Sequence, residues 1–161
     1  MQNLKIYEVN GKYINYLSQI QDHLFISDGS KRNRKYIGIV LVINNFKYFV
    51  PLSSFKDKHK TMKESVDFIK IRDYAVINLN NMVPVPESDF KLIDISIISD
   101  QSYKFLLQAE IREINKQKAR IYKNAEIVYK HKIRFNNSTL LGKRTNDFKN
   151  LEKALISYKQ Q

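Results

Sequence analysis

Residues 36–51 read YIGIVLVI-NN-FKYFVP, and this stretch decides the fold. The first eight residues are almost all apolar, which is typical of a central strand covered on both faces. Asn44-Asn45 predicts a tight turn, and residues 46–50 predict the returning strand of a hairpin, which we expect Pro51 to end.

Shorter β-branched and aromatic runs extend this sheet on both sides of the hairpin. We expect a sheet of five to six strands, with one short helix at residues 11–17. The further candidate strands are residues 4–9, 66–71, 74–79, 82–85 and 90–95, with Arg72-Asp73 as a turn.

From about residue 99 the apolar spacing changes to that of helices. Asp100 or Ser102 is expected to cap a first helix, a second spans about residues 117–130, and a last one begins near residue 146. The class is therefore α+β, with residues 1–98 mostly β and residues 99–161 helical. The expected helical core residues are Phe105, Leu106, Ala109, Ile111, Ile114, Phe148, Leu151, Leu155 and Ile156.

The composition predicts one folded domain with a polyanionic partner. A chain of 161 residues with 43% hydrophobic residues can bury a sizeable core. The formal charge is +12, of which residues 1–100 contribute +3 (14 Lys and Arg against 11 acids) and residues 101–161 contribute +9 (14 against 5). Such an imbalance favours nucleic acid. No secretory signal or membrane helix is visible, and zero Cys fits a reducing cytoplasm, where we expect the protein.

Several kinds of chemistry are excluded by what the sequence lacks. His23, His59 and His131 lie far apart without a metal-binding pattern, and no glycine-rich nucleotide loop occurs among the four glycines. We therefore expect no metal site and no cofactor.

The hairpin brings two polar, cationic segments together at its open end. Residues 31–35 (KRNRK) precede its first strand, and residues 52–60 (LSSFKDKHK) follow its second. Taken alone, each segment also fits a solvated loop, and Ser53-Ser54 also fits a turn. Their convergence on one hairpin end predicts a cationic pocket lined by two serines.

Such a pocket suits RNA, because a nearby 2′-hydroxyl can attack its own phosphodiester without a metal. The protein then has to orient the chain, stabilise charge at phosphorus and move two protons. Losing one preorganised donor to the transition state typically costs about a hundredfold or more in rate.

The C-terminal helices carry many cations with few interspersed acids, which indicates phosphate contacts or an ordinary solvated face. Tyr103, Tyr122 and Tyr129 are candidates for stacking on bases. The residues that we expect to bind RNA around the pocket and on these helices are Lys31, Arg32, Lys58, His59, Lys116, Lys118, Arg120 and Lys123.

Three stretches resemble the ToxN/AbiQ family of endoribonuclease toxins from type III toxin-antitoxin systems. They are KYINYL at residues 12–17, the hairpin followed by PLSSFK at residues 51–56, and INLNNMVPV at residues 77–85. The middle stretch is the most specific, and the last third resembles the family only as a basic helical region.

This resemblance implies a strongly twisted antiparallel sheet related to the PemK/MazF-like barrel toxins, with peripheral helices. It further implies metal-independent, sequence-specific RNA cleavage at adenine-rich sites. It also implies products with a cyclic phosphate and a 5′-hydroxyl, and a role in abortive infection against phage. The implied partners are cellular or phage RNA substrates and a small repeated antitoxin RNA, folded as a pseudoknot, in a closed toxin–RNA hetero-oligomer.

The same resemblance assigns candidate catalytic residues. Ser53 and Ser54 match the Ser/Thr-Ser pair, Lys56 matches the active-site lysine, and Tyr13 matches the tyrosine of the first helix. Arg34 stands where the family has lysine, with Lys35 adjacent, and Phe55 replaces the usual proline. His59 also matches in position, with its role open.

We hypothesise that Lys56 and Arg34 stabilise the phosphorane and that Ser53 or Ser54 orients the scissile phosphate. Tyr13 or Lys35 then assists positioning or proton transfer, while the general base stays unassigned. The alternatives are a non-catalytic RNA-binding protein and a DNA-binding regulator, although no helix-turn-helix signature is present.

Overall fold

An antiparallel sheet, flanked by helices, organises the residues that the structure describes, 1–22, 24 and 34–161 of a computed structural model. The expected α+β class is confirmed, but the expected five or six strands were too few. The count is seven in these ranges, because every candidate strand forms, with residues 82–85 and 90–95 contributing only the short strands β6 and β7. The strands are β1 (Lys5–Val9), β2 (Lys35–Ile43), β3 (Phe46–Ser54), β4 (Phe68–Ile71), β5 (Ala75–Asn78), β6 (Val83–Pro84) and β7 (Phe90–Leu92).

The strand order is β4-β5-β3-β2-β1-β7, with β6 paired to β3, and the sheet does not close. The central hairpin forms as predicted, with Ile43 opposite Phe46. Asn44 and Asn45 have φ angles of 52° and 68°. Two successive positive φ angles match the twist of the flanking strands, which is why asparagine suits this turn.

The prediction that Pro51 ends the returning strand was wrong. Strand β3 pairs with β2 as far as Pro51, which lies opposite Tyr36. It then changes partner, and residues 52–54 pair with β5 on its other side. Proline lacks the N–H of a strand ladder, and it stands where the ladder with β2 stops. The start of β2 and the start of β5 consequently flank the end of β3.

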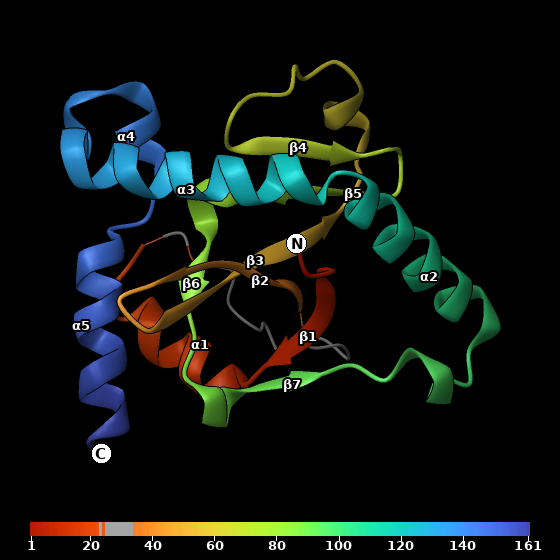
Figure 1. Ribbon diagram of the computed structural model, residues 1–161, viewed down its shortest axis with the longest axis horizontal. Coiled ribbons are helices and arrows are strands. Elements are labelled where there is room, and N and C mark those ends of the chain that lie inside the picture. The colour runs from red at the N-terminus through yellow and green to blue at the C-terminus, as the bar shows by residue number, and fades with distance from the viewer. Residues whose placement is uncertain (23, 25–33) are drawn as a thin grey trace.

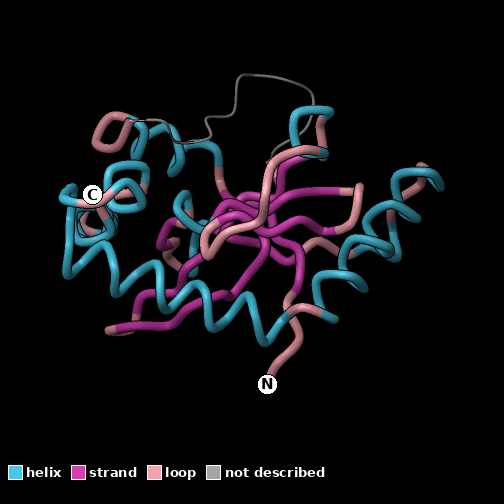
Figure 2. Tube along the Cα trace, turned by 90° about the horizontal axis from the view of Figure 1, so that it is seen from above, coloured by secondary structure: helices cyan, strands magenta, loops and turns pink. Residues whose placement is uncertain are grey.

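Helices surround the sheet, as Figures 1 and 2 show. Helix α3 crosses it, α2 projects at one end, and α4 and α5 lie at the other. Their bounds are α1 (Gly11–Ser18), α2 (Gln101–Lys116), α3 (Lys118–Phe135), α4 (Leu140–Arg144) and α5 (Phe148–Lys159). The predicted cap Asp100 accepts from the Tyr103 amide at 3.1 Å. Helix α4 was not anticipated.

Buried contacts fix these helices to the sheet. The hydroxyls of Tyr48 on β3 and Tyr129 on α3 both donate to Oε2 of Glu152 on α5, at 2.7 and 2.8 Å. On β2, Gly38 lies so close to Phe49 that an added Cβ would be 2.3 Å from the Phe49 ring. These contacts fix the sheet and helices around two hydrophobic clusters, one containing Tyr48 and Tyr129 and the other containing Phe49.

Part of the predicted helical core was wrong. Phe105 and Leu106 are exposed by 63% and 40%, and Ile156 by 48%. Helix α2 buries the predicted Ile114, and it buries Leu107 in place of Phe105 and Leu106, on one stripe at helical spacing. In the described part of the chain, no helix is both long and apolar enough to cross a membrane.

Candidate active site

A hollow of about 440 Å³ lies where β3 changes partner. We call it the cleft. It contains five of the six predicted catalytic residues: Arg34, Lys35, Ser53, Ser54 and Lys56. The expected convergence of the two hairpin-flanking segments is therefore present. The other lining residues are Leu52, Ala75, Tyr103, Leu106, Leu107 and Glu110.

Strand register explains how the cleft is assembled. Tyr36 pairs with Pro51, so Arg34 and Lys35 extend beside the last residues of β3. Ser53 pairs with Val76 and Ser54 with Ala75, which places both serines at the start of β5. Helix α2 supplies the remaining wall. Two strands, a loop and a helix thus bring cations, hydroxyls and a carboxyl to one hollow.

The Ser53 hydroxyl points to a function beyond packing. Its oxygen is buried, and no described residue forms a hydrogen bond with it. Buried polar atoms are nearly always paired, so a hydroxyl left unpaired at a cleft wall is well placed to bind a ligand oxygen. Ser54, by contrast, is exposed.

His59 holds the loop that carries Lys56. Its Nδ1 accepts a hydrogen bond from the Lys56 backbone N–H at 2.8 Å. The ring is 6% exposed and contacts the rings of Phe55 and Phe68, with centroids 5.5 and 5.7 Å away. Burial and the nearby cations Lys58, Lys56 and Lys70 lower the pKa of His59. An uncharged ring keeps Nδ1 available as an acceptor, so His59 positions Lys56 and is not itself a lining residue.

Helix α2 adds Glu110, a cleft residue that sequence reasoning missed. Its side chain is 6% exposed, and burial raises its pKa to about 7, opposed by the charge of Lys35. A carboxyl with this pKa exchanges protons readily at neutral pH. The helical spacing of the sequence could have indicated its burial, because Glu110 lies on the same helix face as the buried Leu107 and Ile114.

Lys35 is oriented by an aromatic ring from the same helix. Its Nζ lies 4.2 Å from the centroid of the Tyr103 ring, a cation–π distance. Tyr103 thus lines the cleft, whereas two other stacking candidates lie elsewhere. Tyr122 donates to the Gln2 carbonyl, and Tyr129 is buried against Glu152.

Tyr13 does not reach the cleft. It is fully buried, and its hydroxyl donates to the Pro84 carbonyl at 2.6 Å. Burial, with a contribution from Asp89, raises the pKa of Tyr13 far above its ordinary range. The structure therefore places Tyr13 apart from the other five predicted catalytic residues, as a buried phenol whose hydrogen bond to Pro84 links α1 to β6.

Of the cations predicted to bind RNA, those that the structure describes do not line the cleft. Lys116 forms an ion pair with Glu113, Arg120 with Glu64, and Lys118 donates to Asn3. Lys58 and Lys123 are exposed. Lys31 and Arg32 lie outside the described residues.

The chain matches known proteins in both sequence and structure. A family model described as "Toxin ToxN, type III toxin-antitoxin system" matches residues 5–156. The endoribonuclease ToxN of Pectobacterium atrosepticum is 35% identical over 121 residues, covering 69% of this chain and 71% of that protein. The endoribonuclease ToxN of Bacillus thuringiensis subsp. kurstaki is 29% identical, covering 99% of this chain and 86% of that protein.

A solved structure supports the same relationship. It comes from work on type III toxin-antitoxin systems and selective toxin inhibition by a non-coding RNA pseudoknot. It matches with a TM-score of 0.85 and 29% identity, over 99% of this chain and 100% of that chain.

Proposed function

Because this chain belongs to the ToxN family of type III toxin-antitoxin toxins, we propose that it is an endoribonuclease whose active site is the cleft. The observation that carries this proposal is the meeting of Arg34, Lys35, Ser53 and Lys56 with the buried carboxyl of Glu110. Cations and a hydroxyl fit a phosphodiester, and a carboxyl with a pKa of about 7 fits proton transfer.

In the proposed reaction the RNA supplies its own nucleophile. The 2′-oxygen forms a bond to the adjacent phosphorus, and its proton goes to the Glu110 carboxylate. The bond from phosphorus to the 5′-oxygen then breaks, and that oxygen takes a proton from Lys56 or Lys35. The products are a 2′,3′-cyclic phosphate and a 5′-hydroxyl, so no water, metal or cofactor is consumed.

The cations act on the charge that builds at phosphorus. Attack gives a phosphorane with more negative charge than the starting diester, and fixed positive groups stabilise that state more than the ground state. Lys56 and Arg34 flank the phosphate in this proposal. The planar guanidinium of Arg34 is suited to a two-point grip on phosphate oxygens, more than to giving up a proton. Ser53 donates to a third oxygen, and Ser54 lies beside it.

The exposed cations outside the cleft extend the RNA-binding surface in this proposal. We assign phosphate contacts to Lys58 and Lys123, and to Lys116, Lys118 and Arg120 where RNA competes with their present partners. A small repeated pseudoknot RNA would cover this surface as antitoxin, in a closed toxin–RNA assembly that acts in the cytoplasm as a phage defence. The kinship to PemK/MazF-like barrel toxins belongs to this proposal as well.

The test is cleavage of single-stranded RNA by the purified chain in the presence of a metal chelator. We expect the wild type to cut and to leave cyclic phosphate ends, detected by mass spectrometry of the fragments. Lys56→Ala should lower kcat about a hundredfold or more, with RNA affinity by filter binding reduced much less. Lys153→Ala is the matched control, since it removes an exposed lysine of α5 that lies outside the cleft and outside the proposed RNA-binding surface. RNA binding without cleavage by the wild type would replace this proposal with the non-catalytic alternative.

A further inference from the structure

A second polar hollow, of about 470 Å³, lies beyond the far end of β5 from the cleft. We call it the amide hollow. Its wall includes Asn80, Asn81, Leu140, Lys143, Arg144 and Asn146. Asn80 and Asn81 belong to the 77–85 stretch singled out in the sequence, and the proposed cleavage reaction does not use them.

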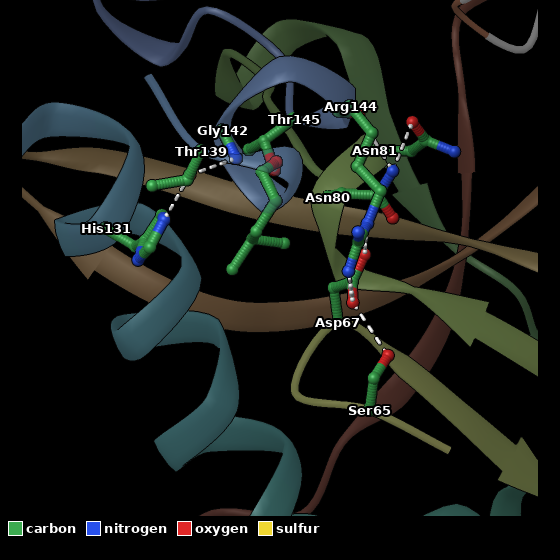
Figure 3. A network of polar contacts seen from close by, with 10 residues as sticks. Ser65, Asp67, Asn80, Asn81, His131, Thr139, Gly142, Arg144 and Thr145 are labelled. Atoms are coloured by element: carbon green, nitrogen blue, oxygen red, sulfur yellow. Dashed lines mark hydrogen bonds and ion pairs between the residues drawn. The ribbon is translucent and has the colours of Figure 1, made fainter. Parts of the chain in front are cut away.

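The wall of the amide hollow is built from distant parts of the chain. Arg144 donates through Nε and Nη2 to the two carboxylate oxygens of Asp67, both at 2.8 Å, and Ser65 holds the same carboxylate. Figure 3 shows the Arg144 side chain between Asp67 and the asparagine pair. The Asn146 amide also donates to the Asn80 carbonyl at 3.0 Å. These contacts hold α4 against the end of β5, so the hollow is formed before any ligand arrives.

Of the two polar atoms of the Asn80 side-chain amide, the nitrogen forms a hydrogen bond with a described residue and the oxygen does not. Its Nδ2 donates to the Arg144 carbonyl at 2.9 Å, which accounts for its structural role. The same Nδ2 also lies 3.5 Å from Oδ1 of Asn81. The Oδ1 of Asn80 is buried, and no described residue donates to it. Buried acceptors are rarely left without a donor, so the fold alone does not account for Oδ1.

Asparagine reads the edge of a nucleobase through its side-chain amide, and the unpaired Oδ1 of Asn80 is an acceptor of this kind. Single-stranded RNA exposes these edges, and proteins bind them by amide hydrogen bonds together with apolar or stacking contacts to the base plane. Leu140 is 79% exposed at the rim and offers an apolar face, while Lys143 adds a cation for the neighbouring phosphate. Amides, an apolar face and a cation together suit a nucleotide better than a phosphate alone.

We propose that the amide hollow binds one unpaired base of the RNA and selects the position of the cut. This inference rests on the proposed function and adds a base-reading site to it. Ala75 lines the cleft and Asn80 lines the hollow. Strand β5 (Ala75–Asn78), which lies between them, spans about 13 Å at roughly 3.3 Å per residue, so the base that is read lies a few nucleotides from the scissile phosphate.

The experiment maps cleavage ends by sequencing, on a random pool of single-stranded RNA. We expect the wild type to show a base preference at one fixed distance from the cut. Asn80→Ser and Asn81→Ala should lower the preference at that position roughly 5- to 150-fold, while the preference at the cut itself persists. Asn150→Ala, on the exposed side of α5, is the matched control. If Asn80→Ser does not fold, Asn81→Ala and Lys143→Gln at the rim provide the result.

A binding measurement separates failure of this inference from failure of the proposed function. In a Lys56→Ala background, which leaves RNA uncut, we expect tighter binding of oligonucleotides with the preferred base, and Asn81→Ala should remove that difference. A wild type that cuts no RNA overturns the proposed function, and the random pool bound by the chain then still reports on the hollow. Folded hollow variants that match Asn150→Ala in both base preference and affinity overturn the inference.

Discussion

Glu110→Gln is expected to inactivate the enzyme and to stabilise the fold at the same time. The raised pKa of about 7 means that the folded protein favours the protonated carboxyl. The difference from the ordinary value of 4.5, at about 1.36 kcal/mol per pH unit, corresponds to roughly 3 kcal/mol. This contribution is fully present below pH 4.5 and is lost as the pH rises through 7. Glutamine keeps the shape and stays neutral, so the variant should avoid the loss.

Two measurements test this. Urea unfolding should show equal stabilities near pH 4.5 and an advantage for the variant that grows to about 3 kcal/mol above pH 7. The wild-type kcat should rise with pH through about 7, and the variant should lose that rise together with about 10²–10⁴ in rate. A variant that is no more stable at pH 8, or that keeps the wild-type pH profile, would refute the reasoning. Glu126→Gln, an exposed glutamate on α3, is the control.

Three further predictions concern the supports of the cleft and the core. His59→Phe removes the acceptor for the Lys56 amide and should lower kcat about tenfold or more, with little change in RNA affinity. His59→Asn should recover part of the lost kcat. Equal kcat values for wild type and His59→Phe in steady-state assays would contradict this prediction. Gly38→Ala forces a Cβ against the Phe49 ring and should destabilise the fold by about 1–3 kcal/mol, and an unchanged melting temperature would show that the strands move apart freely. Glu152→Leu leaves the hydroxyls of Tyr48 and Tyr129 without their acceptor and should cost about 2–5 kcal/mol in urea unfolding, while a cost under about 1 kcal/mol would indicate that water replaces the carboxylate.

Local patterns predicted the parts of the fold that depend on neighbouring residues. The Asn44-Asn45 turn and the Asp100 cap are set by backbone geometry within a few positions. The prediction for Pro51 was wrong because a proline disrupts pairing only with the strand that faces its missing N–H. The missing N–H ends pairing with β2, while β5, more than twenty residues later, continues the strand.

The sequence predicted the cleft residues that the hairpin brings together. It did not predict the residues whose role depends on whether the side chain is buried. Sequence brought together Arg34, Ser53 and Lys56, since one antiparallel pair is enough to place them. It missed Glu110, because a single glutamate on a helix usually lies at the surface. For Tyr13 the motif suggested a place in the cleft, but its hydroxyl donates to a backbone carbonyl. A motif does not reveal whether a phenol faces a pocket or a backbone carbonyl.

The division of the cleft between β3 and α2 has a consequence for protein synthesis. Lys56 and Glu110 are separated by more than fifty residues, so an emerging chain exposes the hairpin before the carboxyl has left the ribosome. A half-made polypeptide therefore lacks one wall of the proposed catalytic centre. Under the proposed mechanism, we expect a nascent chain to begin cutting RNA only after helix α2 has emerged and folded.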